Sequence, residues 1–311
     1  MNAPIQLAAG TLLWRTTGEE REILLVERTQ HRDVSLPKGK LDPGETLPEC
    51  AKRETLEEVG LEVTLRAPLG TSEYRLPSGT DKAVYYWHAE VDQEALDASV
   101  FAPNDEINAL VWLPIEAAKA AVTYKHDVTI IERFEQLIAA EQLDTFPIVL
   151  VRHGKAAAPF SHEGDDASRE LTDTGRAQAK AIAPGIAAFE PTRIVSSTAK
   201  RCRQTMKPLV KRTGIVAKTS RGISQDAFEA HAETVDRKIA KALTLQTGSV
   251  FCSHAPVIPA LVSAVVHASN GTETQAMHRA SMLHPADFTV IHLTRGDNPT
   301  IVTVETHSST P

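Results

Sequence analysis

The first half of the chain is organised around the stretch Gly39-Lys-Leu-Asp-Pro-Gly-Glu45, followed after seven residues by Arg53-Glu-Thr-Leu-Glu-Glu-Val-Gly-Leu61. The second part of this stretch has helical character. On a helix that advances about 100° per residue, three acidic side chains share one face: Glu54, Glu57 and Glu58. The stretch therefore predicts carboxylates that converge beside a loop rich in glycine and proline.

This carboxylate cluster predicts divalent-metal chemistry. Like charges this close destabilise a bare helix, and clusters of carboxylate oxygens bind hard cations such as Mg²⁺. A bound cation would neutralise phosphate oxygens and lower the pKa of a water molecule, while a free carboxylate takes the proton. The alternative for such a cluster taken alone is a solvated acidic helix face. The chemistry that matches the cluster is hydrolysis of a pyrophosphate bond.

The spacing from Gly39 to Leu61 resembles the Nudix box of the Nudix hydrolases. The resemblance implies an α/β/α sandwich with a mixed sheet, and hydrolysis of a nucleoside diphosphate linked to another moiety. It also implies Mg²⁺, or Mn²⁺ in its place, held by a glycine carbonyl and acidic side chains: Gly39, Glu54, Glu57, Glu58 and, from a second loop, Glu106. Within this set, Glu57 and Glu58 would be catalytic. Thr55 departs from the family, which usually has an aliphatic residue there.

Substrate-binding residues are expected beside the same motif. The loop Ser35–Lys40 resembles members of the family that cut extended polyphosphate chains, where Lys38 and Lys40 would meet phosphates; the alternative is a pair of solvated loop lysines. Tyr74 and Tyr86 are candidates for stacking on a nucleobase. Because side chains alternate across a strand, at least half of the aromatic residues in this region are expected in the core instead.

The second half opens with a continuous apolar run followed by a charged tripeptide. Ile148-Val-Leu-Val151 is typical of a buried parallel strand, and Arg152-His-Gly154 follows at its carboxyl end, where open α/β sheets bind ligands. Three further motifs come in order: Leu171-Thr-Asp-Thr-Gly-Arg-Ala-Gln-Ala179, Val195-Ser-Ser-Thr-Ala-Lys-Arg-Cys-Arg-Gln-Thr205 and Ser253-His-Ala-Pro256. Strands and helices alternate throughout, which predicts a three-layer α/β domain.

These motifs resemble the histidine phosphatase superfamily, over residues from about 147 to 311. The resemblance implies that His153 is a phosphorylated nucleophile and that three side chains form its phosphate pocket: Arg152, Arg201 and His254. Neutral imidazole is a competent nucleophile near pH 7, and arginines can stabilise the transferring phosphoryl oxygens without a metal.

The proton donor of this second half is expected to differ from that of many relatives. Where they carry an acidic residue, this chain has Gln225, and Asp226 is the nearest substitute. Glutamine cannot donate a catalytic proton as a carboxylic acid does. The phosphatase is therefore expected to be slow, or confined to substrates with good leaving groups.

Local patterns predict the order of the elements. In the first half we expect strands at 6–14, 22–27, 61–69, 83–91 and 109–113, and helices at 48–59 and 128–140. In the second half we expect strands at 148–152, 192–196, 214–218, 249–253, 286–293 and 300–306, and helices at 172–189, 199–212 and 231–246. A polar stretch that ends in Pro147 separates the halves, so the predicted division is a domain at 1–141, a linker at 142–147 and a domain at 148–311.

Composition excludes several classes of protein. The chain has 311 residues, and 33 Lys and Arg against 40 Asp and Glu give a formal charge of 33 − 40 = −7, the wrong sign for broad binding to nucleic acid. Three scattered cysteines give no disulfide framework, and the sequence shows neither a secretion signal nor an apolar run long enough to span a membrane. We therefore expect a cytoplasmic protein with no membrane or nucleic-acid partner.

The two halves together resemble actinobacterial MutT-type proteins that fuse a Nudix domain to a histidine phosphatase domain. This implies a small nucleotide substrate and the sanitising of oxidised guanine nucleotides, 8-oxo-dGTP and 8-oxo-GTP, with cleavage of diadenosine polyphosphates. The Lys38 loop suggests an alternative, a diadenosine or diphosphoinositol polyphosphate hydrolase. Gln225 suggests another, in which the second domain is a non-catalytic phosphate-binding or assembly module. A homo-oligomer, or contacts between domains of different chains, stays open.

Overall fold

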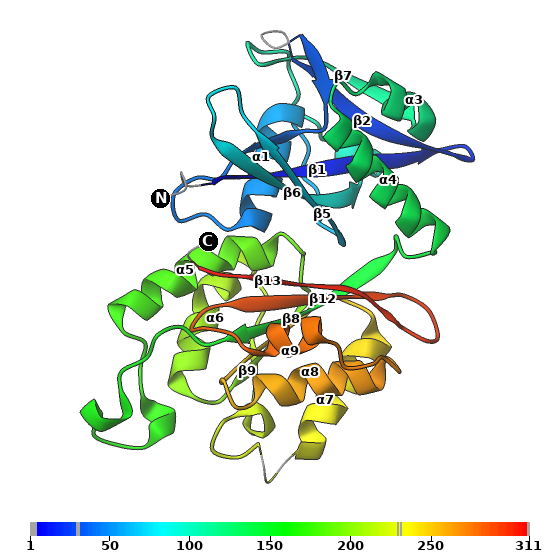
Figure 1. Ribbon diagram of the computed structural model, residues 1–311. Coiled ribbons are helices and arrows are strands. Elements are labelled where there is room, and N and C mark those ends of the chain that lie inside the picture. The colour runs from blue at the N-terminus through cyan, green and yellow to red at the C-terminus, as the bar shows by residue number, and fades with distance from the viewer. Residues whose placement is uncertain (1–4, 29–31, 229, 231, 310–311) are drawn as a thin grey trace. The chain divides into compact units, whose positions relative to one another are not determined.

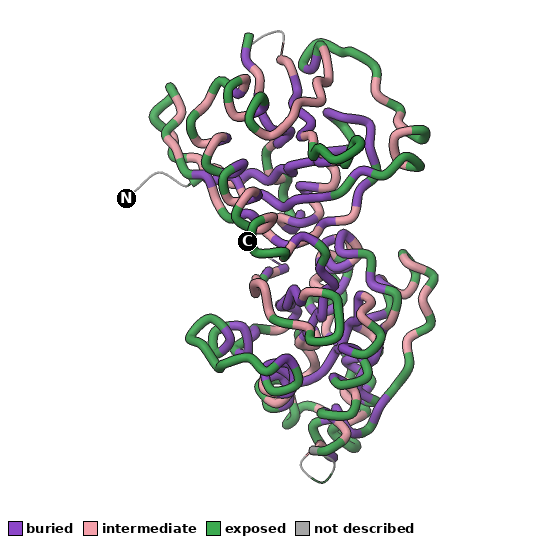
Figure 2. Tube along the Cα trace, turned by 90° about the vertical axis from the view of Figure 1, so that its right-hand side faces the viewer, coloured by how far each residue is buried: buried purple, intermediate pink, exposed green. Residues whose placement is uncertain are grey.

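The structure is a computed structural model that describes residues 5–28, 32–228, 230 and 232–309 (Figure 1). The chain divides into two units by its internal contacts. The first reaches Leu143, except for Gly44–Thr46, and the second begins at Asp144. Each unit combines helices with one mixed β-sheet, which confirms the predicted α/β class. Figure 2 shows buried residues along the strands of each unit and exposed residues on many of the loops.

The sheet of the first unit has the order β3-β2-β1-β6-β5, with β4 paired to β1 and β7 paired to β2. β1 and β6 run parallel, and the other pairs are antiparallel. The strands are β1 (Gln6–Thr17), β2 (Glu20–Arg28), β3 (Asp33–Ser35), β4 (Lys38–Lys40), β5 (Pro68–Arg75), β6 (Asp81–Glu90) and β7 (Ile107–Pro114).

Helices cover both faces of this sheet. They are α1 (Leu47–Val59), α2 (Gln93–Asp97), α3 (Ile115–Ala121) and α4 (Lys125–Ala139). Side chains alternate along β1, so Leu12 packs with Phe134 of α4 on one face, while Leu13 packs with Val59 of α1 on the other. The result is the predicted α/β/α sandwich, with α1 fixed against β1 and β4.

The sheet of the second unit has the order β10-β9-β11-β8-β12-β13. Its first four strands are parallel, and β12 and β13 are antiparallel. The strands are β8 (Thr145–Arg152), β9 (Arg193–Ser197), β10 (Lys218–Ser220), β11 (Ser249–Ser253), β12 (Phe288–Thr294) and β13 (Ile301–His307). Because β8, β9 and β11 are parallel neighbours, their carboxyl ends meet at one edge of the sheet.

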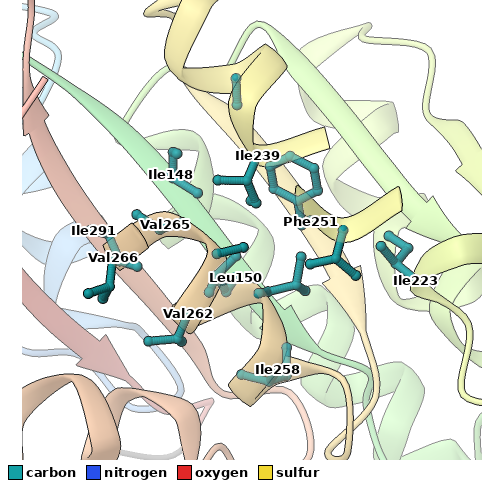
Figure 3. Packing of buried hydrophobic residues seen from close by; sticks show 14 of the residues in the cluster. Ile148, Leu150, Ile223, Ile239, Phe251, Ile258, Val262, Val265, Val266 and Ile291 are labelled. Carbon is teal, nitrogen blue, oxygen red and sulfur yellow. The ribbon is translucent and has the colours of Figure 1, made fainter. Parts of the chain in front are cut away.

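Two layers of helices enclose this second sheet (Figure 1). The helices are α5 (Asp173–Ala187), α6 (Lys200–Thr213), α7 (Ala232–Leu245), α8 (Ile258–Ala268) and α9 (Gln275–Ser281), with short 3₁₀ turns η1 (Pro159–Ser161), η2 (Asp166–Ser168) and η3 (Arg221–Ile223). On one face, Leu150 and Phe251 pack against Ile239 of α7 and Val262 of α8 (Figure 3). On the other face, Cys252 of β11 contacts Cys202 of α6.

The structure corrects part of the predicted element list. Residues 61–67 form no strand: their apolar side chains alternate as in a strand, but they pack into the core, and the ladder begins only at Pro68. Residues 145–147, expected in the linker, belong to β8 and pair with β12. The strand expected at 214–218 is instead β10, Lys218–Ser220. The predicted start of a helix at residue 231 lies outside the described residues, and α7 begins at Ala232.

Several helices are absent from the predicted list: α2, α3, α8 and α9. The most buried of them, α8, is apolar on most of its surface, so it lacks the polar stripe that identifies a surface helix. Within the part of the chain that the structure describes, no helix is both long and apolar enough to cross a membrane.

Candidate active sites

Helix α1 is held on β1 by a buried polar contact at Thr55. The Thr55 hydroxyl donates to the Ala51 carbonyl at 2.7 Å and lies 2.8 Å from the Thr11 hydroxyl, so that Thr11 is left to donate to it. The hydroxyl that replaces the usual aliphatic group is therefore satisfied where it is buried. Its place on the helix leaves the acidic face of α1 turned toward the loop at β4.

The most buried of the three acidic side chains is Glu58, which is 5% exposed. The backbone N–H of Lys38 donates to Glu58 Oε2 at 2.8 Å. Burial raises the pKa of Glu58 to about 7 against the opposing charge of Lys38, and the carboxylates of Glu54 and Glu106 raise it further. The structure thus brings Glu106, from the loop before β7, within electrostatic reach of α1.

An arginine joins the other two carboxylates. Arg53 Nη1 lies 2.6 Å from Glu54 Oε1 and 2.9 Å from Glu57 Oε2, and Arg53 Nη2 donates to the Lys40 carbonyl at 3.0 Å. Among the described residues, no three His, Cys, Asp or Glu side chains are grouped closely enough to hold a metal ion. The Arg53 guanidinium thus partly neutralises the carboxylates of Glu54 and Glu57.

Gly39 places the loop directly against Glu54. A Cβ at residue 39 would lie 1.9–2.2 Å from the carboxylate atoms of Glu54, closer than real contacts allow. Any other residue would push this carboxylate aside. Only glycine at position 39 therefore keeps the loop backbone and the Glu54 carboxylate together, as a shared metal site would need.

Two of the residues expected to contact substrate are buried. Tyr86 is 1% exposed and packs in the core, so its ring has no free face for a nucleobase. Lys38 is 6% exposed, its Nζ donates to Ser35 Oγ at 3.2 Å, and burial lowers its pKa. Lys40 is exposed, and Tyr74 is half-buried with its ring stacked on His126 at 4.3 Å.

In the second unit, the structure brings the two predicted histidines onto Arg201. His153 Nδ1 donates to the Gly154 carbonyl at 2.8 Å, which leaves the Nε2 lone pair to accept from Arg201 Nε at 3.2 Å. Arg201 Nη2 lies 3.1 Å from His254 Nδ1. Because a guanidinium only donates, His254 carries its proton on Nε2, which lies 2.8 Å from Ser197 Oγ.

Both histidines are electrically neutral. Burial lowers the pKa of His153 to about 4. The hydrogen bond to Gly154 raises this pKa, and the charge of Arg201 lowers it further. Burial and the same guanidinium lower the pKa of His254 to about 2. The unprotonated Nε2 of His153 is therefore the form present at neutral pH.

A cavity of about 280 Å³ opens beside His153, and Arg152, Arg169 and Gln225 line it. Arg152 Nη1 donates to the Leu283 carbonyl at 2.7 Å, while its buried Nε has no partner among the described residues. A small cavity lined by arginines and a neutral histidine has the donors that a phosphate group needs.

The structure does not bring Asp226 to this cavity. Asp226 is exposed, whereas Gln225 lines the cavity and its Oε1 lies 3.5 Å from Arg201 Nη2. The expected substitution of Asp226 for the missing acid is therefore not supported by its position. No carboxylic acid stands among the described residues that line the cavity.

Two residues that the sequence analysis did not single out, Asp166 and Arg169, lie beside Arg201 in the second unit. Asp166, in η2, contacts Arg201 through Oδ2 at 2.8 Å and Arg169 through Oδ1 at 2.6 Å. The only signal in the sequence was that Asp166 comes three residues before Arg169. Such acid–arginine pairs are common on protein surfaces, so the spacing does not indicate a functional site. The contact with Arg201, 35 residues away, depends on the fold.

Comparison with known proteins identifies both units. Residues 4–134 match the NUDIX domain family, and residues 148–224 match the histidine phosphatase superfamily (branch 1). The "8-oxo-(d)GTP phosphatase" of Mycolicibacterium smegmatis is 35% identical over 264 residues, which cover 82% of this chain and 79% of that protein.

Two further similar proteins match shorter parts of the chain. The "Bis(5'-nucleosyl)-tetraphosphatase [asymmetrical]" of Mus musculus is 31% identical over 111 residues, which cover 33% of this chain and 71% of the mouse protein. Among solved structures, an Ap4A hydrolase of C. elegans is 26% identical, with a TM-score of 0.40, and the match covers 44% of this chain and 99% of that one.

Proposed function

The chain belongs to the Nudix hydrolases and carries a histidine phosphatase domain behind its Nudix domain, and from this premise we propose that it hydrolyses oxidised guanine nucleotides, 8-oxo-dGTP and 8-oxo-GTP, in a Mg²⁺-dependent reaction. The similarity to the mycobacterial 8-oxo-(d)GTP phosphatase across both halves supports this substrate class. The observation that carries the hydrolase chemistry is the acidic face of α1, held against the loop backbone at Gly39.

The donors on this face suit a hard divalent cation by their chemistry, and they would have to draw together around it once Arg53 turns away. Glu58 is buried and its pKa is raised to about 7, with Glu54 and Glu106 adding unfavourable charge, which a cation would relieve. Glu54, Glu57, Glu58, Glu106 and the Gly39 carbonyl would hold Mg²⁺, or Mn²⁺ in its place. When bound, the cation supplies charge neutralisation at phosphate oxygens and lowers the pKa of a water molecule.

Around that cation, the chain's own residues bind and orient the nucleotide. Arg53 must turn away from Glu54 or Glu57 to free their oxygens, and the Lys40 ammonium lies exposed beside the same loop, where it can meet the phosphates. The half-buried ring of Tyr74 is the remaining candidate for stacking on the base. Glu57 or Glu58 would take the proton of the attacking water.

The second domain would remove a phosphate by a metal-free route. His153 Nε2 would attack phosphorus, and Arg152, Arg201 and His254 would hold the phosphoryl oxygens. Since no acid lines the cavity among the described residues, the leaving group receives no proton from a carboxyl there. This favours a phosphoanhydride, whose leaving phosphate is stable as an anion, and a nucleoside diphosphate fits that requirement.

The first test measures turnover of 8-oxo-dGTP, dGTP and diadenosine tetraphosphate with Mg²⁺, and separates the products chromatographically. We expect a higher kcat/KM for 8-oxo-dGTP than for the other two. If none of these three nucleotides is hydrolysed, the proposal is wrong. Product analysis with His153→Ala and with Glu58→Gln then shows which phosphate each domain removes.

A second candidate is a diadenosine or diphosphoinositol polyphosphate hydrolase whose second domain only binds phosphate. The lysine-bearing loop favours it, although Lys38 is buried and bonded to Ser35. A higher kcat/KM for diadenosine tetraphosphate or diphosphoinositol pentakisphosphate than for 8-oxo-dGTP, with no phosphohistidine on His153, would favour this candidate over the first.

A further inference from the structure

The Asp166 carboxylate already occupies the arginines that a phosphate would need. Asp166 Oδ2 lies 2.8 Å from Arg201 Nη2, its Oδ1 lies 2.6 Å from Arg169 Nη2, and its backbone carbonyl accepts from Arg201 Nη1 at 2.6 Å. Two guanidinium groups thus converge on one carboxylate. Carboxylate and phosphate oxygens are bound by arginine with the same geometry, so the two compete for it.

All three nitrogens of Arg201 are committed in this arrangement. Nε donates to His153, Nη1 to the Asp166 carbonyl, and Nη2 to both the Asp166 carboxylate and His254. Arg201 is fully buried. A phosphate that binds Arg201 as fully as the proposed reaction requires must therefore take donors from Asp166.

Asp166 is anionic in this arrangement. Burial raises the pKa of its carboxyl group, but the hydrogen bonds and charges of Arg169 and Arg201 outweigh burial, and the pKa lies below its ordinary value. A carboxyl group that is ionised at neutral pH cannot donate the proton that the leaving group lacks. Its charge instead opposes an incoming phosphate.

We propose that Asp166 sets the phosphate affinity of the second domain, by acting as an internal anion that substrate phosphate displaces from Arg201 and Arg169. The proposal rests on the proposed phosphatase function of this pocket. Displacement frees the donors of Arg201, and the segment that carries Asp166 moves away from it. A substrate must supply enough binding energy to displace Asp166. Substrates that bind through a single phosphate therefore bind more weakly than substrates with further contacts, which makes Asp166 a specificity-determining residue.

The test compares Asp166→Asn with the wild-type chain, using orthophosphate and p-nitrophenyl phosphate as probes in EDTA. Asparagine keeps the shape and removes the charge. We expect the Kd of orthophosphate, measured by calorimetry, and the KM of p-nitrophenyl phosphate to fall about tenfold, with kcat changed less than about twofold. Asp165→Asn is the matched control, because it removes the neighbouring negative charge in the same segment, and both constants should stay unchanged.

Two outcomes would overturn the proposal while leaving the phosphatase function intact. An unchanged Kd in Asp166→Asn would mean that the carboxylate does not compete with phosphate. A fall in kcat of about 100-fold with phenyl phosphate, whose leaving group needs a proton, but not with p-nitrophenyl phosphate, would make Asp166 the proton donor instead. If neither protein binds orthophosphate or turns over the ester, the phosphatase function fails and this proposal fails with it.

A measurement on the wild-type chain does not depend on the variant folding. Hydrogen exchange of the backbone amides of Ser168 and Arg169, which donate within this segment, is followed with and without orthophosphate. Displacement of Asp166 predicts faster exchange when phosphate is bound. Slower exchange would show that phosphate binds with Asp166 in place, and would contradict the proposal.

Discussion

The two sites handle charge in different ways. On α1, acidic side chains share one face of the helix, and Arg53 joins Glu54 and Glu57 through ion pairs. In the second domain, two neutral histidines are hydrogen-bonded to one buried arginine. Carboxylates of like charge repel one another unless a cation lies between them. A guanidinium that donates and neutral imidazoles that accept form hydrogen bonds without any added ion. Metal dependence should therefore belong to the first site alone, and each of the following experiments can break that division.

The largest effect is expected at His153. His153→Ala removes the nucleophile, so phosphatase turnover of p-nitrophenyl phosphate should fall by about 10⁴-fold or more. Trapping under alkaline conditions, where the acid-labile P–N bond survives, should find phosphohistidine in the wild-type chain and none in the variant. Mg²⁺-dependent hydrolysis of 8-oxo-dGTP should be unchanged. His267→Ala, at an exposed histidine at the end of α8, is the control. Loss of both activities in His153→Ala would refute the independence of the sites.

The reciprocal variant is Glu58→Gln. The amide keeps the size of the buried side chain but removes its charge, so Mg²⁺-dependent hydrolysis should fall by about 10³-fold while phosphatase turnover stays constant. Glu62→Gln, which changes an exposed acid just beyond α1, should leave both rates unaltered. Retained nucleotide hydrolysis in Glu58→Gln would remove α1 from the mechanism.

The pH dependence of the phosphatase separates a buried His153 from an ordinary histidine by an effect of about 30-fold at pH 5. Because burial lowers the pKa of His153 to about 4, the neutral nucleophile accumulates as pH rises through 4, and phosphatase kcat/KM should be level above 5. At pH 5 about nine tenths of His153 is neutral, against about 3% for a histidine with the ordinary pKa of 6.5. An acid limb near 6.5 in the rate profile would contradict the buried, arginine-bound histidine.

A smaller effect is expected from Gly39→Ala. The new Cβ displaces the Glu54 carboxylate, the flexible end of a side chain, so the fold should survive while nucleotide hydrolysis falls by about 10-fold to 100-fold. Gly271→Ala, where a Cβ meets its neighbours only at 3.3 Å and beyond, is the matched control. Unchanged hydrolysis in Gly39→Ala would show that the contact between Gly39 and Glu54 is not used.

The spacing of residues on a single helix was enough to predict the acidic face of α1. The same spacing could not predict which neighbouring side chains are buried. The acidic face of α1 follows from the helical period, whereas the burial of Lys38 and Tyr86 depends on how β1, β4 and β6 pack. The extended segment 61–67 illustrates the same limit, because its alternation reports which side chains are buried and not whether a strand pairs there.

In the second domain, the parallel strands let the sequence predict which residues meet. His153 and His254 each follow a buried apolar strand, and neighbouring parallel strands end at one edge. Asp166 comes from an irregular loop, where no period fixes the position of a side chain. Its contact with Arg201 is a product of tertiary structure, and so is the absence of Asp226 from the cavity.

The central claim, that one chain carries a metal-dependent and a metal-free phosphate chemistry, is tested most directly by EDTA titration of two variants side by side. Hydrolysis of 8-oxo-dGTP in His153→Ala and of p-nitrophenyl phosphate in Glu58→Gln are followed in parallel. We predict that chelation abolishes the first activity, that excess Mg²⁺ restores it, and that the second is unchanged throughout. Loss of the second activity in EDTA, or survival of the first, would contradict the account.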